Sequence, residues 1–228
     1  MYNFLSIIWY KVLPAHYGGQ KDISRFNQHL GLKVHLTALC SSDNKSNEPL
    51  SYKIVAALPV SKTQFFNPAT KKLILNQISR QHYSHVILEH PYHAWIGKHK
   101  KKWGVKLIVH AHNIEFLRMK QRKKWWWPWV KYVEKKAFDR ADFILFKTNK
   151  DLLLAKDMFN VTDEKSIIVP YGTDISNQSI LPESAKNKIR LKHNLNPEEK
   201  IILFAGTPDY EPICRFNRRI FAVGRCIY

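Results

Sequence analysis

The chain has 228 residues, of which 45% are hydrophobic and 13% aromatic, and 37 lysines and arginines against 18 acidic residues give a net charge of +19. This composition supports a folded core and excludes a disordered polycation, and no apolar run reaches the ~18–20 residues that a transmembrane helix needs. The three scattered cysteines form no CxxC pair, which argues against a disulfide framework or zinc site and indicates a reducing, cytoplasmic compartment.

Short apolar runs of strand length recur from the first residues onward. The first of them, Phe4–Trp9, has no basic leader and no cleavage site, so we expect no signal peptide. The runs show little alternation of polar and apolar side chains, which is typical of parallel strands that are covered on both faces. The predicted strands are Phe4–Trp9, Lys33–Cys40, Tyr52–Leu58, His85–Glu89, Lys106–His110, Phe143–Lys147 and Ser166–Pro170.

Amphipathic stretches of helix length lie between these runs. In Gln20–Leu30, the apolar residues Ile23, Phe26 and Leu30 form one stripe, and Gly31 follows at the position of a C-cap. The alternation of strands and helices predicts right-handed crossovers and an α/β fold with a doubly wound, Rossmann-like parallel sheet. The other predicted helices are Lys71–Gln81, Trp125–Ala141, with Pro128 in its first turn or at a kink, and Asn149–Phe159.

The composition changes after Asp174, which marks the expected end of the first domain, residues 1–175. A linker and a helix, Ser184–His193, are expected over 176–199. A new apolar strand, Lys200–Ala205, would open a second α/β domain, but residues 200–228 are too few for a domain of ordinary size. We therefore expect 200–228 to be the truncated start of a second domain.

The loops that follow the predicted strands are the expected binding positions, because ligands bind at the carboxyl ends of strands in open parallel sheets. Gly18 and Gly19 follow the first strand and lead directly into a helix. Paired glycines let backbone amides approach a ligand, and a helix N-terminus favours an anion, so this loop is a candidate phosphate or sugar site. A tight turn without a ligand is the alternative.

Polar residues also follow the fourth strand, in Glu89–His93, and the fifth, which suggests a cleft at two neighbouring strand ends. Here His112 would hydrogen-bond a sugar hydroxyl, Asn113 would orient the loop and Glu115 would cap the next helix. Capping or packing is the alternative role for such a histidine. His110 and His112 are weak evidence for a metal site without a nearby cysteine or carboxylate pattern, so we expect no metal.

The segment after the last strand of the first domain contains Tyr171, Gly172 and Asp174. A glycine at this position allows a sharp turn across the cleft, and Asp174 would hold the turn by accepting backbone amides. A simple linker turn is equally consistent with these residue types.

Taken in order, these features resemble the N-terminal domain of a GT-B glycosyltransferase of family 4, the retaining, nucleotide-sugar-dependent type. The resemblance covers about residues 3–212, and it depends on the ordered set of segments rather than on any one of them. The matching segments are the Gly18-Gly19 loop, HNIE at 112–115, YVEKKAFDRAD at 132–142, TNKD at 148–151, VPYGTD at 169–174 and ILFAGTPDYEP at 202–212.

The resemblance implies a two-domain enzyme that transfers a sugar from a nucleotide-sugar donor to a lipid-linked or polysaccharide acceptor. It implies that Gly18 and Gly19 lie near the donor phosphates and the acceptor, and that His112 is the catalytic residue that contacts the transferred sugar. It implies no metal, and no cofactor other than the nucleotide-sugar as co-substrate. The further expected donor- or acceptor-binding residues are Asn113, Glu115, Tyr171, Gly172 and Asp174.

The sequence departs from the family in one large respect. The family carries a spaced pair of glutamates in its second domain, and no pair with that spacing occurs here. We therefore expect a truncated chain that binds a nucleotide-sugar poorly. The alternative is a non-catalytic remnant that binds only an acceptor or a membrane.

The stretch from Lys98 to Lys150 has 16 lysines and arginines against 4 acidic residues. Basic residues are attracted to anionic headgroups by ~1 kcal/mol each, and tryptophan prefers the headgroup level. This stretch predicts peripheral contact with the inner face of a membrane, with a solvated or packed face as the alternative. Nucleic-acid binding is a rival, although no RRM, KH, helix-turn-helix or zinc-finger pattern occurs. The expected contact residues, which we call the basic-tryptophan segment, are Arg122, Lys123, Lys124, Trp125, Trp126, Trp127 and Trp129.

Overall fold

The computed structural model describes residues 1–61, 63–172 and 183–196. They belong to two units, Met1–Gly172 and a second unit of which helix α7 (Glu183–Lys192) is the described element. The predictions for Asp174 and for the strand Lys200–Ala205 lie outside the described residues. No helix in the described part of the chain is long and apolar enough to cross a membrane.

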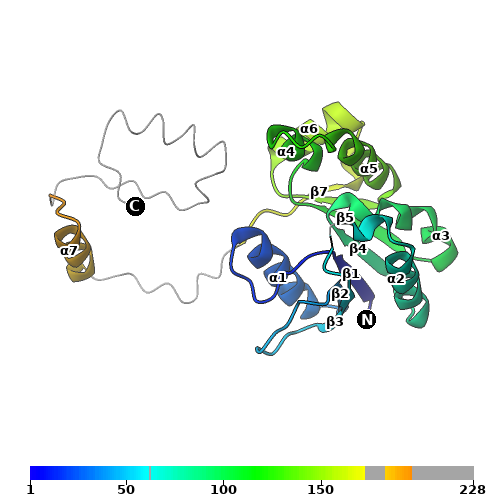
Figure 1. Cartoon of the computed structure of the whole chain (residues 1–228), viewed down its shortest axis with the longest axis horizontal. Coiled ribbons are helices and arrows are strands. Elements are labelled where there is room, and N and C mark those ends of the chain that lie inside the picture. Colours follow the sequence, from blue (N-terminus) through cyan, green and yellow to red (C-terminus); the bar gives the residue numbers. More distant parts are fainter. Residues whose placement is uncertain (62, 173–182, 197–228) are drawn as a thin grey trace. The chain divides into compact units, whose positions relative to one another are not determined.

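The first unit contains a seven-stranded sheet in which every pairing is parallel (Figure 1). The strand order is β3-β2-β1-β4-β5-β6-β7, so the order reverses beside β1, as in a doubly wound Rossmann-like fold. The predicted fold class is therefore confirmed. The strands are β1 (Asn3–Ile8), β2 (His35–Ser41), β3 (Lys53–Leu58), β4 (His85–Glu89), β5 (Lys106–Ala111), β6 (Phe143–Phe146) and β7 (Ser166–Ile168).

Both faces of the central strands are buried, because helices flank the sheet on both sides (Figure 1). In β1, Leu5 and Ile7 contribute to the larger core, whereas Ile8 contributes to the core on the other face with Ile23 of α1. Successive side chains of a strand point to opposite faces of the sheet. When both faces are buried, apolar side chains are favoured at every position instead of alternating with polar ones. This is the physical reason for the continuous apolar runs in the sequence.

The structure forms an α-helix in each of the predicted segments of the first unit that has a long amphipathic stripe. Helix α1 includes Gly31 as its last residue, so the prediction that Gly31 is a C-cap was wrong. Glycine is required there by a close approach, since a Cβ atom would lie 2.6 Å from the carbonyl oxygen of Ser51. Pro128 lies in the first turn of α5, as expected. The α-helices are α1 (Gly18–Gly31), α2 (Pro68–Arg80), α3 (Lys100–Trp103), α4 (Glu115–Gln121), α5 (Trp127–Arg140) and α6 (Asn149–Phe159).

The described residues of the first unit also form three 3-10 helices, and the longest of them was not predicted. They are η1 (Gln64–Phe66), η2 (Pro91–Lys98) and η3 (Asp163–Lys165). Helix η2 follows the end of β4 directly and packs against α5. It therefore forms part of the edge of the sheet at which the site residues lie.

Candidate functional site

The carboxyl ends of β4, β5 and β6 bring together a cluster of charged and imidazole side chains. Glu89 is the last residue of β4, His112 follows the end of β5, and Lys147 follows the end of β6. Asp22 joins them from the second turn of α1. We call Asp22, Glu89, His110, His112 and Lys147 the charged cluster. All five side chains are buried, with at most 7% of each exposed.

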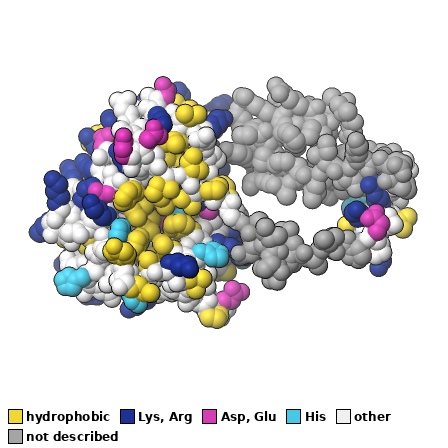
Figure 2. All heavy atoms as spheres, turned by 180° about the vertical axis from the view of Figure 1, so that it is seen from behind, with side chains coloured by type: hydrophobic (Ala, Val, Ile, Leu, Met, Phe, Trp, Pro, Cys, Tyr) yellow, Lys and Arg dark blue, Asp and Glu magenta, His cyan; other side chains and the backbone are white. Residues whose placement is uncertain are grey.

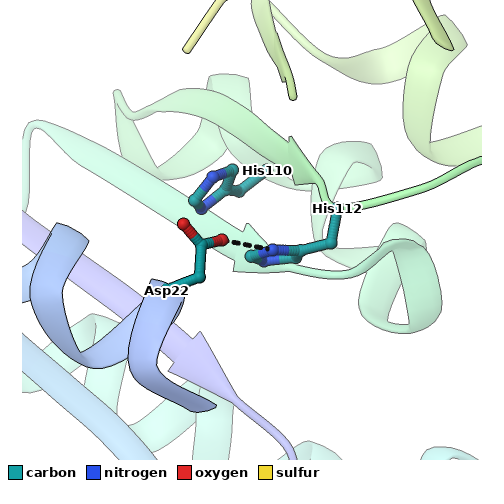
Figure 3. A group of neighbouring side chains, drawn as sticks. All are labelled: Asp22, His110 and His112. Atoms are coloured by element: carbon teal, nitrogen blue, oxygen red, sulfur yellow. Dashed lines mark hydrogen bonds and ion pairs between the residues drawn. The ribbon is translucent and has the colours of Figure 1, made fainter. Parts of the chain in front are cut away.

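His112 lies between two carboxylates. Its Nδ1 atom is 2.9 Å from Oδ2 of Asp22, as Figure 3 shows, and its Nε2 atom is 2.9 Å from Oε2 of Glu89. Burial alone lowers the pKa of His112, but the hydrogen bonds to Asp22 and Glu89 outweigh it and hold the pKa above its ordinary value. Both ring nitrogens of His112 are therefore occupied by carboxylates, and its predicted contact with a sugar stays a prediction.

The two carboxylates of the cluster have further partners. Lys147 donates to Asp22 at 2.8 Å, and Ser6 donates to Glu89 at 3.3 Å. Burial raises the pKa of both carboxyl groups, but the cations and imidazoles beside them outweigh it, so each pKa lies below its ordinary value. Both groups are therefore ionised at neutral pH.

His110 is buried beside the same carboxylate. Its Nδ1 atom is 2.9 Å from Oε2 of Glu89, and its Nε2 atom has no hydrogen-bond partner among the described residues. Burial lowers the pKa of His110 to about 4, so its imidazole is neutral at neutral pH. His110 thus contributes a polar ring to the cluster but no charge.

Among the described residues, three side chains place one possible cation ligand atom each within 4.8 Å of one another. They are Asp22, His110 and His112. Asp22 already pairs with Lys147, and His112 uses both ring nitrogens. A bound cation would have to displace Lys147 and the protons of His112. Absence of a metal stays a prediction, and the observed contacts are those of an ion-pair network.

Glu115 has a different role from the one expected. Its carboxylate does not cap α4; it contacts Nδ1 of His90 at 3.3 Å and accepts hydrogen bonds from Tyr92 and Arg118. Burial raises the pKa of Glu115, but these partners outweigh it and lower the pKa to about 2.

His90 has a φ of 80°, an unfavourable backbone conformation for a residue with a side chain, at the carboxyl end of β4.

The N-terminus of α4 is capped instead by Glu134 of α5. The two carboxylate oxygens of Glu134 accept the backbone amides of Glu115 at 2.7 Å and Phe116 at 3.0 Å. Burial is the largest influence on the pKa of Glu134 and raises it to about 8, although the two amides oppose the shift. Glu134 therefore links α5 to the helix that carries Glu115.

Glu134 gives the first testable prediction. A carboxyl group whose folded pKa is raised stabilises the fold below its unfolded pKa of about 4.5, and this stability is lost as the pH rises through about 8. We expect the free energy of unfolding of the wild type to fall by at least about 1 kcal/mol relative to Glu134→Gln between about pH 6 and pH 9. Urea unfolding at both pH values measures the difference. Parallel pH profiles for the two proteins would contradict the prediction.

The glycines of the first loop lie at the start of α1 and are exposed. Neither has a positive φ, a Cβ atom at Gly18 would meet open space, and at Gly19 it would make an ordinary contact 3.8 Å from Oη of Tyr10. Neither packing nor a left-handed turn therefore requires glycine. The absence of side chains leaves the first amides of the helix accessible, which fits the predicted anion-binding loop.

The remaining predicted binding residues follow the ends of β5 and β7 in the chain. Asn113 is partly buried and lies between His112 and the start of α4. Tyr171 is 58% exposed, and Nζ of Lys147 lies 5.1 Å from the centre of its ring, which connects this segment to the charged cluster. A Cβ atom at Gly172 would meet open space. The binding roles of these residues stay predictions.

The basic-tryptophan segment lies at the corner between α4 and α5. Arg122, Lys123 and Lys124 are exposed, and Trp125 is 88% exposed. The other three tryptophans pack partly against the larger core, as the alternative of a packed face expected, and the membrane contact stays a prediction. Those three are Trp126, Trp127 and Trp129.

The sequence analysis missed Asp22 and Lys147 as site residues, placed Glu89 in the predicted cleft, and considered His110 only as a metal ligand. Asp22 and His112 are 90 residues apart in the chain, and Asp22 and Lys147 are 125 apart. No local spacing connects such positions. The available signal was the presence of polar residues at the ends of apolar strands, which identified His112 and Glu89 but gave no indication of Asp22 or Lys147.

A family model described as glycosyltransferase family 4 matches residues 21–177, more than half of the chain. No curated protein sequence matches the chain. Sucrose-phosphate synthase from Thermosynechococcus elongatus is similar in structure, with a TM-score of 0.65 and 14% identity over 91% of this chain and 56% of that protein.

Two further solved structures are similar to the chain. WaaG, a glycosyltransferase involved in lipopolysaccharide biosynthesis, has a TM-score of 0.58 and 15% identity over 86% of this chain and 53% of that protein. Anabaena Alr3699/HepE, crystallised with UDP, has a TM-score of 0.56 and 12% identity over 83% of this chain and 50% of that protein. At these identities the likeness shows the fold. The chain spans about half the length of these solved proteins.

Proposed function

The chain belongs to glycosyltransferase family 4, and on this premise we propose that it transfers a sugar from a nucleotide-sugar donor to a lipid-linked or polysaccharide acceptor, with retention of the anomeric configuration. The observation that carries the proposal is the position of His112 within the charged cluster, at the carboxyl ends of a doubly wound sheet. The cocrystallisation of HepE with UDP, and the part of WaaG in lipopolysaccharide biosynthesis, support a nucleotide-linked donor and a lipid-linked acceptor.

The accessible N-terminus of α1 supports the donor part of the proposal. The first amides of a helix have no partner inside the helix, and the helix dipole favours an anion beside them. Because Gly18 and Gly19 carry no side chains, a phosphate group can approach these amides directly. Charge neutralisation by amides and basic side chains would stabilise a leaving diphosphate.

A donor assay tests this function. The purified chain is incubated with UDP-, GDP- and ADP-linked sugars in the presence of lipid extract or polysaccharide, and release of the nucleoside diphosphate is measured. Because a chain without the spaced glutamates is expected to bind a donor weakly, we expect slow release that requires a high donor concentration, with transfer of the sugar in unchanged anomeric configuration. Absence of release from every donor would contradict the proposal and favour a non-catalytic binding protein.

We further propose that the chain contacts an anionic membrane surface through Arg122, Lys123, Lys124 and Trp125. Their exposure at one corner supports this interpretation, because attraction to headgroups requires charges and an indole that solvent can reach. One face of the molecule shows hydrophobic side chains gathered at its centre and basic side chains at its margin (Figure 2). A membrane contact would bring a lipid-linked acceptor to the enzyme.

Vesicle flotation gives the second testable prediction. We expect simultaneous replacement of Arg122, Lys123 and Lys124 by alanine to weaken binding to anionic vesicles by about 100-fold, since each basic residue contributes ~1 kcal/mol. The matched control removes the same number of charges from the exposed lysines Lys33, Lys53 and Lys72, and retains binding. Equal losses in both variants would contradict a localised contact, and tighter binding to oligonucleotides than to vesicles would favour the nucleic-acid alternative.

A further inference from the structure

The contacts of His112 determine its charge state. A neutral imidazole has one N–H group and one lone pair, so it can donate a hydrogen bond to one acceptor only. Here both ring nitrogens lie 2.9 Å from carboxylate oxygens, those of Asp22 and Glu89. A neutral ring would direct a lone pair at one of these oxygens, whereas a doubly protonated ring donates to both.

The charges around His112 lead to the same conclusion. The ionisable groups that face it are Asp22 on α1, Glu89 and His90 at the end of β4, His110 on β5 and Lys147 after β6. His90 and His110 are buried rings whose pKa values are lowered by desolvation. Two cations, His112 and Lys147, then balance the two carboxylates, whereas a neutral His112 would leave one buried carboxylate without a counter-charge.

We propose that Asp22 and Glu89 are positioning residues that hold His112 as an imidazolium cation beside the donor site, with both of its N–H groups fixed in direction. The role toward the donor depends on the function proposed above, but the charge state does not. With Lys147 and the two carboxylates, the His112 cation forms a cluster of fixed charges that has no net charge, and such preorganised dipoles can stabilise charge that develops during sugar transfer. Asp22 and Glu89 act through His112 and need not touch the substrate.

Nitrogen NMR of the folded wild-type chain, labelled with 15N-histidine, tests the charge state directly. The His112 signals are assigned by their loss in His112→Gln. An ordinary histidine, with a pKa near 6.5, is almost entirely neutral at about pH 8. We expect both ring nitrogens of His112 to be protonated at that pH. A non-protonated nitrogen would overturn the proposal and indicate that one of the carboxyl groups carries the proton instead.

Asp22→Asn tests the positioning role. The variant keeps the size of the side chain and removes its charge, so we expect the protonation constant of His112 to fall at least tenfold. We expect the alkaline limb of the pH–kcat profile to move by the same amount. Asp157→Asn, which removes an exposed charge from α6, is the matched control and leaves both unchanged. An unchanged protonation constant in folded Asp22→Asn would overturn the role of Asp22.

The two proposals fail in different ways. A protonated His112 in a chain that releases no nucleoside diphosphate would refute the enzymatic function and keep the charge assignment. A neutral His112 in an active chain would refute the charge assignment and keep the function. The wild-type NMR measurement requires neither a variant nor turnover, so it decides the charge state in either case.

Discussion

Replacing His112 by glutamine is expected to lower kcat/KM for the donor by about 100-fold, because removal of one preorganised electrostatic group from an active site has an effect of this size. Glutamine keeps most of the volume of histidine and can donate to one carboxylate, but it carries no charge. The donor assay described above measures the loss, with the rate normalised to the amount of folded protein.

The separate kinetic parameters show how His112 acts. If its charge stabilises the transition state, kcat and kcat/KM fall together, whereas loss of simple donor binding raises KM with little change in kcat. The matched control is His82→Gln, because His82 is an exposed histidine just before β4, at the opposite edge of the sheet. Equal activity of folded His112→Gln and wild type would contradict a catalytic role for His112.

The second large effect is expected for Lys147→Met, which should lower the free energy of unfolding by about 3 kcal/mol. Methionine preserves the aliphatic length of lysine but leaves Asp22 with a buried charge and one fewer cationic partner. This loss is a substantial part of the 5–15 kcal/mol that stabilises an ordinary domain. Urea unfolding near pH 7 measures it.

The same substitution at an exposed ion pair is the control. Lys156 pairs with Asp163 at 2.6 Å, but 77% of the Asp163 side chain is exposed, so Lys156→Met should cost less than about 1 kcal/mol. The double variant Asp22→Asn with Lys147→Met should recover part of the stability, because it removes the unbalanced carboxylate. Equal destabilisation by Lys147→Met and Lys156→Met would contradict a special role for burial.

The sheet was predictable because its physical signal is local. A strand buried on both faces must be apolar at nearly every position, and His85–Glu89 was predicted with the boundaries of β4. Long amphipathic helices were predictable for the same reason. Helix η2 was missed because Pro91–Lys98 has no period that distinguishes a 3-10 helix from a loop. Its Gly97 is required by tertiary packing, since a Cβ atom there would lie 2.5 Å from Cβ of Arg140 on α5.

In the basic-tryptophan segment, too, one part was predictable from the local sequence and another part depends on tertiary packing. The residue types indicated an interfacial surface, and the run of tryptophans gave no information about which rings are exposed. The turn between α4 and α5 exposes Trp125, while Trp126, Trp127 and Trp129 meet the core. The direction in which each ring points depends on how α4 and α5 pack, which adjacent residues do not encode.

The order of strands and helices and the position of His112 at a strand end follow from the sequence alone, because hydrophobic periodicity is a property of neighbouring residues. The hydrogen bonds of His112 to Asp22 and Glu89, and the pairing of Asp22 with Lys147, were decided only by the tertiary structure. Parallel strands bring their carboxyl ends to one edge of the sheet whatever their separation along the chain. Burial at that edge then makes the charge of each group depend on partners contributed by other strands and helices.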